Sequence, residues 1–243
     1  MLQDSTIRLL FSFFALLLAA PVHAQESAAN PVPPEIEDEL KPRKALGARV
    51  MSDLSPEAQK VLRERLAASS QRPMSPVPKR TKKAMYDMMA AFSPLSMRDM
   101  FNFMTDKIKV EEGITFDEVL ESMEIKANAL NFKKVGHSEF WKDVAAIGGL
   151  PTTRVEVLHY CDALVGRRML DYSAEFSVFI PCRITVYEDA NGDLWVMTLD
   201  WDVSWLALAW HPGSQLDEQL KQDAIFIRDV MREIMQAGAA GAW

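Results

Sequence analysis

The chain contains two cysteines, Cys161 and Cys182, and these side chains have the greatest potential for chemistry. A predicted strand ends at Cys161 and Cys182 opens a later one, so the two sulfur atoms are expected at the same end of a sheet if those strands pair antiparallel. In an oxidising compartment such a pair favours a structural disulfide. The alternative is a reversible dithiol or sulfur-handling pair, in which Arg183, or a helix N-terminus beginning at Asp162, lowers a thiol pKa.

His159 stands two residues before Cys161 and falls on the same face of the predicted strand. With Cys161 and Cys182 it offers three ligands for a soft metal ion such as copper or zinc. A lone histidine among valines is more often a core or rim side chain that is hydrogen-bonded to a neighbour. His137, at a strand end, and His211, in a turn, are separate candidates that also fit surface positions.

Methionines recur at helical spacing in region 81–107, which is predicted to form two amphipathic helices. Met97, Met100 and Met104 resemble a thioether site for copper(I), because soft sulfur ligands suit that ion. Methionine also fills irregular apolar gaps, so such a stripe more often packs onto a core. The same faces could dock a second copy of the chain or another protein.

Tryptophans are concentrated in region 195–210, where Asp200 and Asp202 stand on either side of Trp201. Aromatic and acidic side chains can line a ligand pocket, although core packing under a helix is the more common use. No histidine or lysine stands beside the two acids to complete an acid–base pair. The chain also has no Gly-rich phosphate loop, nucleophile elbow, His-Glu-x-x-His or Cys-x-x-Cys motif, so no enzyme class is indicated.

The elements that must position these residues follow one another in the order strand, helix, four strands, helix. Thr115 and Glu118 form a capping box at the start of the first helix, whose apolar stripe needs a flat partner. Asn191-Gly192 suits the positive φ angles of a tight hairpin turn. We expect strands over 107–111, 132–137, 153–161, 183–188 and 194–199, with helices over 115–130 and from the N-cap Ser214 to 237. This order predicts an α+β fold.

Three stretches, GITFDE at 113–118, YCDA at 160–163 and FIPCRITVYE at 179–188, resemble the DUF302 family. The likeness covers about Ile108 to Met235 and places the domain at 108–237, with a tail at 238–243. It implies a two-layer fold in which helices cover an antiparallel sheet in a TBP-like arrangement, often as a dimer, and it brings no established activity. Where family members often have Cys-Asn-Pro, this chain has Cys161-Asp162-Ala163.

The N-terminal region has the pattern of an export signal. One basic residue precedes the apolar run Leu9–Ala20, and Val22-His23-Ala24 supplies a cleavage site after residue 24. The run is shorter than the roughly 20 residues that cross a bilayer. We therefore expect a signal peptide over 1–24 and a periplasmic protein. A proline-rich mobile linker over 25–80 should follow, with a short helix from Pro56 to about Ala68 that Ser55 caps.

The net charge of −7 makes nucleic acid an unlikely partner, and no second long apolar run predicts a membrane span after leader cleavage. These observations favour an exported, non-enzymatic binding module with a groove near Cys161, His159 and Cys182 for a small molecule, a soft metal ion or a protein partner. The competing hypothesis is a periplasmic thiol-redox or sulfur- and metal-handling protein that uses the two cysteines.

Overall fold

The computed structural model describes residues 32–40, 54–68, 73–202, 206, 209, 211, 214 and 216–242. The predicted signal peptide lies outside these residues, as do Trp205 and Trp210 of the tryptophan-rich region. Among the helices that are described, none combines the length and the apolar composition needed to cross a bilayer.

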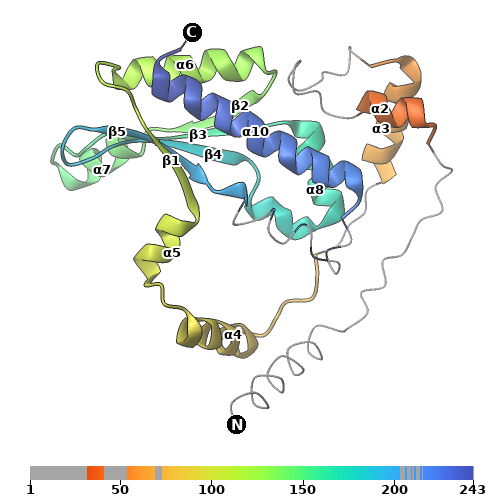
Figure 1. Cartoon of the computed structure of the whole chain (residues 1–243), viewed down its shortest axis with the longest axis horizontal. Helices are drawn as coiled ribbons and strands as arrows, with labels where there is room; N and C mark the ends of the chain where they lie inside the picture. The colour runs from red at the N-terminus through yellow and green to blue at the C-terminus, as the bar shows by residue number, and fades with distance from the viewer. Residues whose placement is uncertain are drawn as a thin grey trace, which may run out of the picture. The chain divides into compact units, whose positions relative to one another are not determined.

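Five antiparallel strands form one sheet within the described residues, in the order β1-β5-β4-β3-β2 (Figure 1). The strands are β1 (Thr105–Lys109), β2 (Lys133–Ser138), β3 (Val155–Cys161), β4 (Cys182–Glu188) and β5 (Leu194–Leu199). All five predicted strands are confirmed, each to within two residues at either end. Together with the helices that cover the sheet, they confirm the two-layer α+β fold.

Helix α6 (Phe116–Ala129) begins with the predicted capping box. The hydroxyl of Thr115 accepts a hydrogen bond from the Glu118 amide at 3.3 Å, and the Glu118 carboxylate accepts one from the Thr115 amide at 2.7 Å. This exchange satisfies two backbone donors that the helix itself cannot pair. The apolar stripe of α6, which includes the buried Val119 and Met123, then packs against the sheet and α10.

Helix α10 (Glu218–Ala240) lies beside α6 on the same face of the sheet (Figure 1). Its N-cap is Asp217, whose carboxylate accepts a hydrogen bond from the Leu220 amide at 2.7 Å. The prediction that Ser214 caps this helix was wrong. Asp217 is an equally good N-cap residue, and Ser214 instead lies in a turn in which its amide donates a hydrogen bond to the His211 carbonyl. The helix ends at Gly241, which has a φ of 57°.

Alternation along β3 divides the sheet into a buried face and a half-exposed face. Glu156, Leu158 and Tyr160 point into the layer under the helices and are almost completely buried. Val155, Val157, His159 and Cys161 share the other, half-exposed face. The predicted grouping of His159 with Cys161 is therefore confirmed. The principal core forms between the sheet and the two helices, with Met123, Leu158, Ile184, Val196, Ile227 and Ile234 among its members.

The predicted hairpin joins β4 to β5 through the loop 189–193. Gly192 has a φ of 81°, as expected, but Asn191 is not among the described residues with a positive φ. The loop is longer than a two-residue turn, since the Asp189 amide donates to the Asp193 carbonyl at 2.9 Å. A two-residue turn would need a positive φ at both Asn191 and Gly192, whereas this longer loop needs it at Gly192 alone.

Two helices interrupt the predicted run of four strands. Helix α7 (Phe140–Gly148) has no side-chain cap at its start, and its end is marked by Gly149, with a φ of 66°. Helix α8 (Ala163–Tyr172) is capped by Asp162, whose carboxylate accepts from the Leu164 and Val165 amides, and the short 3-10 helix η2 (Ala174–Val178) follows it. An uncapped nine-residue helix leaves few sequence signals, which explains why α7 was not predicted.

The region before the sheet contains α2 (Pro34–Leu40), α3 (Pro56–Ala68), α4 (Lys79–Phe92) and α5 (Met97–Phe103). The predicted helix that Ser55 caps is confirmed, with the Ser55 hydroxyl accepting from the Ala58 amide at 3.2 Å. Helix α2 was not expected in the proline-rich linker. It is favoured by Pro34 at its first position, and Glu39 near its end accepts a 2.6 Å hydrogen bond from the Ser55 hydroxyl.

Candidate functional site

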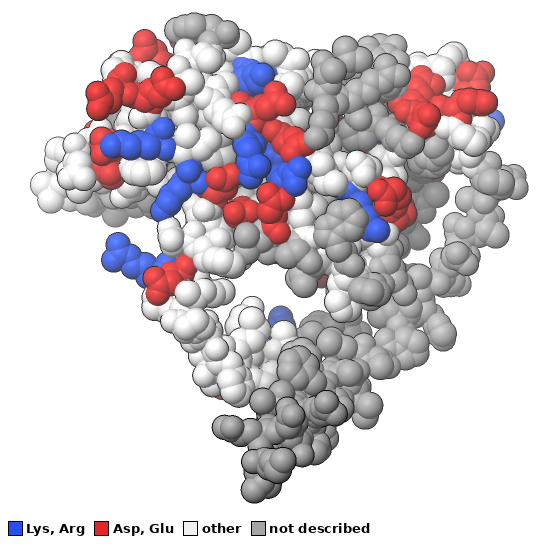
Figure 2. All heavy atoms as spheres, viewed as in Figure 1, with Lys and Arg blue, Asp and Glu red and all other residues white. Residues whose placement is uncertain are grey.

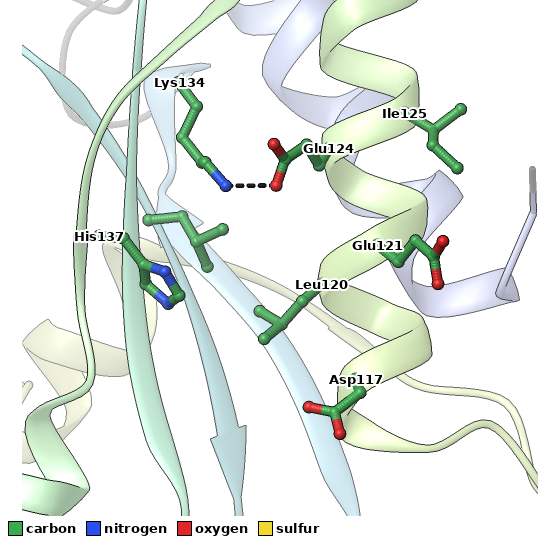
Figure 3. Close-up of a pocket in the computed structure, with 8 residues that line it drawn as sticks. Asp117, Leu120, Glu121, Glu124, Ile125, Lys134 and His137 are labelled. Atoms are coloured by element: carbon green, nitrogen blue, oxygen red, sulfur yellow. Dashed lines mark hydrogen bonds and ion pairs between the residues drawn. The ribbon is translucent and has the colours of Figure 1, made fainter.

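A hollow of about 430 Å³ lies between α6 and the β2 side of the sheet (Figure 3). Leu120 and Leu158 give it an apolar base. The other residues that line it are Asp117, Glu121, Glu124, Ile125, Lys134 and His137. In the close-up, Asp117, Leu120 and Glu124 project from α6 toward the strands. The hollow is therefore an apolar-based site with ionisable groups on both walls, large enough for a small molecule.

A β-bulge brings Lys134 and His137 to the same wall of the hollow. In strict alternation, residues three apart point to opposite faces of a strand. Here Lys134 pairs with Tyr160, Gly136 with His159 and His137 with Leu158, so Val135 is the extra residue. Since Tyr160 and Leu158 belong to the buried face, the bulge turns both Lys134 and His137 toward α6.

Glu156 is a buried carboxylate beside the hollow, and three side chains form hydrogen bonds with it. Its side chain is 1% exposed. One oxygen accepts from Arg154 Nε at 2.7 Å and from Trp141 Nε1 at 3.1 Å, and the other lies 2.7 Å from His137 Nε2. Burial raises the pKa of Glu156, but the hydrogen bonds from Arg154, His137 and Trp141 outweigh it and leave the pKa below the ordinary value. Glu156 therefore stays ionised.

Arg154 connects this carboxylate to the first turn of α6. Its guanidinium lies 2.8 Å from Asp117 Oδ1 and 4.1 Å above the centre of the Phe116 ring. A planar guanidinium can pair with a carboxylate at its edge and stack on an aromatic ring with its face. Arg154 thus holds the start of α6 in place relative to Glu156. This contact positions the wall of the hollow that α6 forms.

The contact with Glu156 determines which His137 nitrogen can meet a ligand. An ionised carboxylate can only accept, so the Nε2 atom carries a hydrogen and a neutral ring leaves a lone pair on Nδ1. Within the part of the chain that is described, Nδ1 has no hydrogen-bond partner. His137 can therefore accept a hydrogen bond from a molecule in the hollow.

Two carboxylates on α6 provide further acceptors. Asp117 uses Oδ1 for Arg154, and Glu124 uses Oε2 for its ion pair with Lys134, shown as a dashed line in Figure 3. The second oxygen of each is unpaired among the described residues. The hollow thus presents more acceptors than donors, which suits a ligand with amine or hydroxyl groups.

The two cysteines meet at the other end of β3, as predicted. Cys161 and Cys182 border the same cavity, which has a volume of about 20 Å³. Both are free thiols, so the predicted disulfide is not formed in this structure. A cavity of that size holds about one water molecule. The groove predicted near these residues is therefore closed, because α8 packs over Cys161 and a Cβ on Gly166 would lie 3.4 Å from its sulfur.

The surroundings of the cysteines disfavour thiolates. Burial and the Asp162 carboxylate raise the pKa of Cys161, and burial raises the pKa of Cys182 to about 12. Arg183 pairs with His159 across β3 and β4 on the half-exposed face, while Cys182 pairs with Tyr160 on the buried face. The charge of Arg183 lowers the pKa of Cys182, but burial outweighs it, so Arg183 does not give the activated thiol that the redox hypothesis expected.

The predicted metal ligands do not assemble. Among the described residues, no group of three or more histidine, cysteine, aspartate or glutamate side chains could hold a metal ion, and this includes His159 with Cys161 and Cys182. Burial and the charge of Arg183 lower the pKa of His159. His211 is exposed in a turn.

The methionines proposed for copper lie along α5 and at its end. Met97 is 76% exposed, whereas Met100 and the C-cap residue Met104 are half-buried. Their helical spacing is as predicted, and copper binding there stays a prediction.

In the tryptophan-rich region, Trp201 is a buried core residue, and Asp202 pairs with Arg228 at 2.8 Å. Core packing, the more common use of such residues, is thus confirmed for Trp201.

The residues of the hollow were missed in the sequence, with His137 considered only as a surface candidate. One signal was present: Glu156 alternates with Leu158 and Tyr160, so a charge occurs in an otherwise apolar strand face. A buried acid in such a row requires donors nearby, and Arg154 stands two residues before it.

Comparisons with known proteins identify the domain. No curated protein matches the chain. A crystal structure of an uncharacterized conserved protein DUF302 from Bacillus stearothermophilus aligns with a TM-score of 0.45 and 18% identity, over 55% of this chain and 97% of that one. The family model described as "Domain of unknown function DUF302" matches residues 107–237, more than half of the chain. The chain belongs to the DUF302 family.

Proposed function

We propose that this chain is an exported, non-enzymatic binding module whose DUF302 domain takes up a small molecule in the hollow between α6 and β2. The observation that carries the proposal is the fixed orientation of His137, whose Nε2 lies 2.7 Å from the buried Glu156. A histidine oriented in this way presents Nδ1 as a defined acceptor. Preorganised polar groups over an apolar base are typical of small-molecule sites.

The ligand is expected to donate hydrogen bonds and to carry an apolar portion. His137, Asp117 and Glu124 provide acceptors, and Leu120 and Leu158 provide apolar contact. Amino alcohols, polyamines and sugars with amine groups have this chemistry. Lys134 can additionally contact one acceptor on the ligand, because an ammonium group has three donors.

Thermal unfolding with a panel of these compounds tests the proposal. A compound that binds only the folded state stabilises it by RT ln(1 + L/Kd), where L is its free concentration, so the melting temperature rises with the logarithm of the concentration once this exceeds Kd. His137→Ala should abolish the rise. Lys133→Ala is the matched control, since Lys133 lies on the same strand outside the lining of the hollow. An equal rise in wild type and His137→Ala would reject the site.

Export is part of the proposal and is supported by the apolar run Leu9–Ala20 followed by the Val22-His23-Ala24 sequence. Cell fractionation with intact-mass measurement should find the protein in the periplasm with Gln25 as its first residue. A cytoplasmic protein that keeps Met1 would contradict it.

A thiol-redox role of Cys161 and Cys182 is the second candidate, supported by their position on one shared cavity. It would require α8 to move away from the thiols before they react. An intact mass that changes reversibly by the loss of two hydrogens under mild oxidant would favour it over ligand binding.

A further inference from the structure

Helix α4 is amphipathic and its apolar side is uncovered. Met85, Met88, Met89 and Phe92 recur at i, i+3, i+4 and i+7, which places them on one side of the helix. No residue of α4 is buried, and Phe92 is 78% exposed. Among the described residues nothing covers this stripe, and an uncovered apolar helix face of this kind indicates a contact with another surface.

The start of α4 carries concentrated positive charge. Its sequence opens KRTKK, so four cations stand at positions 79, 80, 82 and 83. The acid Asp87 pairs with Lys83 at 2.6 Å. This helix belongs to a chain with a net charge of −7. Elsewhere, on the face of the domain shown in Figure 2, acidic and basic side chains are interspersed.

These cations are placed where they reduce the stability of the helix. The first turn of a helix has a partial positive charge, so acids stabilise it and cations destabilise it. The first turn of α4 has no acid, and Pro78 supplies no side-chain cap. Helices α5 and α6, in contrast, each begin with a capping box closed by an acid. The helix's own stability does not explain the basic cluster, which indicates an anionic surface outside the chain.

The shape of the segment suits a flat surface. Helix α5 follows α4 after residues 93–96 and exposes Phe101 and Phe103. A helix of fourteen residues is about 21 Å long, less than the roughly 30 Å of a bilayer core. Helix α4 can therefore lie along a bilayer surface but cannot span it.

The distribution of the cations favours lipid over an acidic protein groove. At about 100° per residue, positions 79, 80, 82 and 83 spread over an arc of about 160° on the polar side of the helix. A single acidic ridge on a protein could face only part of this arc, whereas lipid headgroups surround a half-embedded helix. Methionine and phenylalanine contribute apolar area without the shape specificity of a fitted protein interface.

We propose that α4 binds an anionic membrane surface, with its methionine and phenylalanine side chains among the acyl chains and its lysines and arginine among the headgroups. The DUF302 domain is thereby held next to a membrane. The proposal does not depend on the ligand hollow.

Co-sedimentation of the full chain with vesicles tests it, using the N-terminus that intact mass finds after purification. Binding is expected to vesicles that mix phosphatidylglycerol with phosphatidylcholine, with little to pure phosphatidylcholine, and it should weaken as salt increases. K79Q/R80Q/K82Q/K83Q should reduce binding at least about tenfold, because each cation near an anionic surface contributes. M85S/M89S/F92S tests the apolar side and should reduce binding to a similar extent.

The matched control is K60Q/K109Q/K133Q/K142Q, which removes four exposed lysines outside α4 and α5. It should keep wild-type affinity within about twofold, since these side chains lie away from the proposed membrane contact. Circular dichroism and melting temperature check that every variant folds. Equal losses in the control and in the α4 variants, or equal binding to neutral vesicles, would overturn the proposal. An absence of vesicle binding would also overturn the proposal. If the chain then self-associates and M85S/M89S/F92S abolishes that self-association, the partner of α4 is a second copy of the chain.

Discussion

His137 Nε2 lies 2.7 Å from Oε2 of Glu156, a carboxylate whose side chain is 1% exposed. This contact joins the bulged edge strand β2 to the buried face of β3. It gives His137 one orientation and leaves Nδ1 as the acceptor available to a ligand. The contact therefore links the stability of the fold to the chemistry of the hollow.

Glu156→Gln should lower the free energy of unfolding by about 3 kcal/mol at neutral pH, because the change leaves a buried charge network without its anion. Urea unfolding measures the effect. Glu121→Gln, an exposed acid on α6, is the control and should change stability by less than about 0.5 kcal/mol.

The cost of Glu156→Gln should also depend on pH. Hydrogen bonds hold the folded pKa of Glu156 below the ordinary value of 4.5, against the effect of burial. A depressed pKa contributes stability that is fully present above the unfolded pKa and is lost as the pH falls through the folded one. The difference between wild type and variant should thus shrink on acidification below 4.5. A difference that stays constant to low pH would show that the carboxylate is not stabilised as described.

The two thiols should react slowly with Ellman's reagent in the folded protein. Burial raises the pKa of both cysteines, that of Cys182 to about 12, so few thiolates exist near neutral pH. Both should react at least about tenfold faster in urea, and the half-buried Cys161 should be the faster of the two in the folded state. Cys161→Ala and Cys182→Ala assign the two rates. Rates that match those in urea, or thiols that appear only after reduction, would contradict this environment.

Gly238→Ala should destabilise the packing of α10 against α6. A Cβ at this position would lie 2.5 Å from Met123 Cγ and 3.3 Å from Val119 Cγ1, so a side chain must shift. We expect a loss of about 1–3 kcal/mol in thermal or urea unfolding. At Gly148, the last residue of α7, a Cβ meets nothing within 4 Å, so Gly148→Ala should leave stability unchanged or raise it by up to about 1 kcal/mol. Equal effects of the two substitutions would refute the close approach of the helices.

The positions of the five strands along the chain and the caps of α3 and α6 were predictable from the sequence, because alternation, capping boxes and turn residues are local signals. The site depended on contacts that local signals do not encode. Alternation in β3 separates two faces without saying which one is buried, and the valines on the half-exposed face are as apolar as their neighbours. The burial of Glu156 follows from donors on β2, α7 and the residue that precedes β3.

The bulge at Val135 is a second nonlocal feature. Read as an unbroken strand, β2 places Lys134 and His137 on opposite faces, and the one local sign of the bulge is Gly136, directly after the extra residue Val135. The bulge became visible only in the pairing of β2 with β3. For the two cysteines, their location at the same end of the sheet was predictable from the positions of the strands. The packing of α8 over Cys161 was not.

The most direct test of the ligand hollow is amide NMR of the labelled protein, titrated with the panel of amino alcohols, polyamines and amino sugars. A compound that binds should shift amides of β2 around Lys134 and His137 and of α6 from Asp117 to Glu124, and His137→Ala should remove these shifts. Shifts that instead centre on Cys161 and Cys182, or a panel that leaves the hollow unchanged, would contradict it.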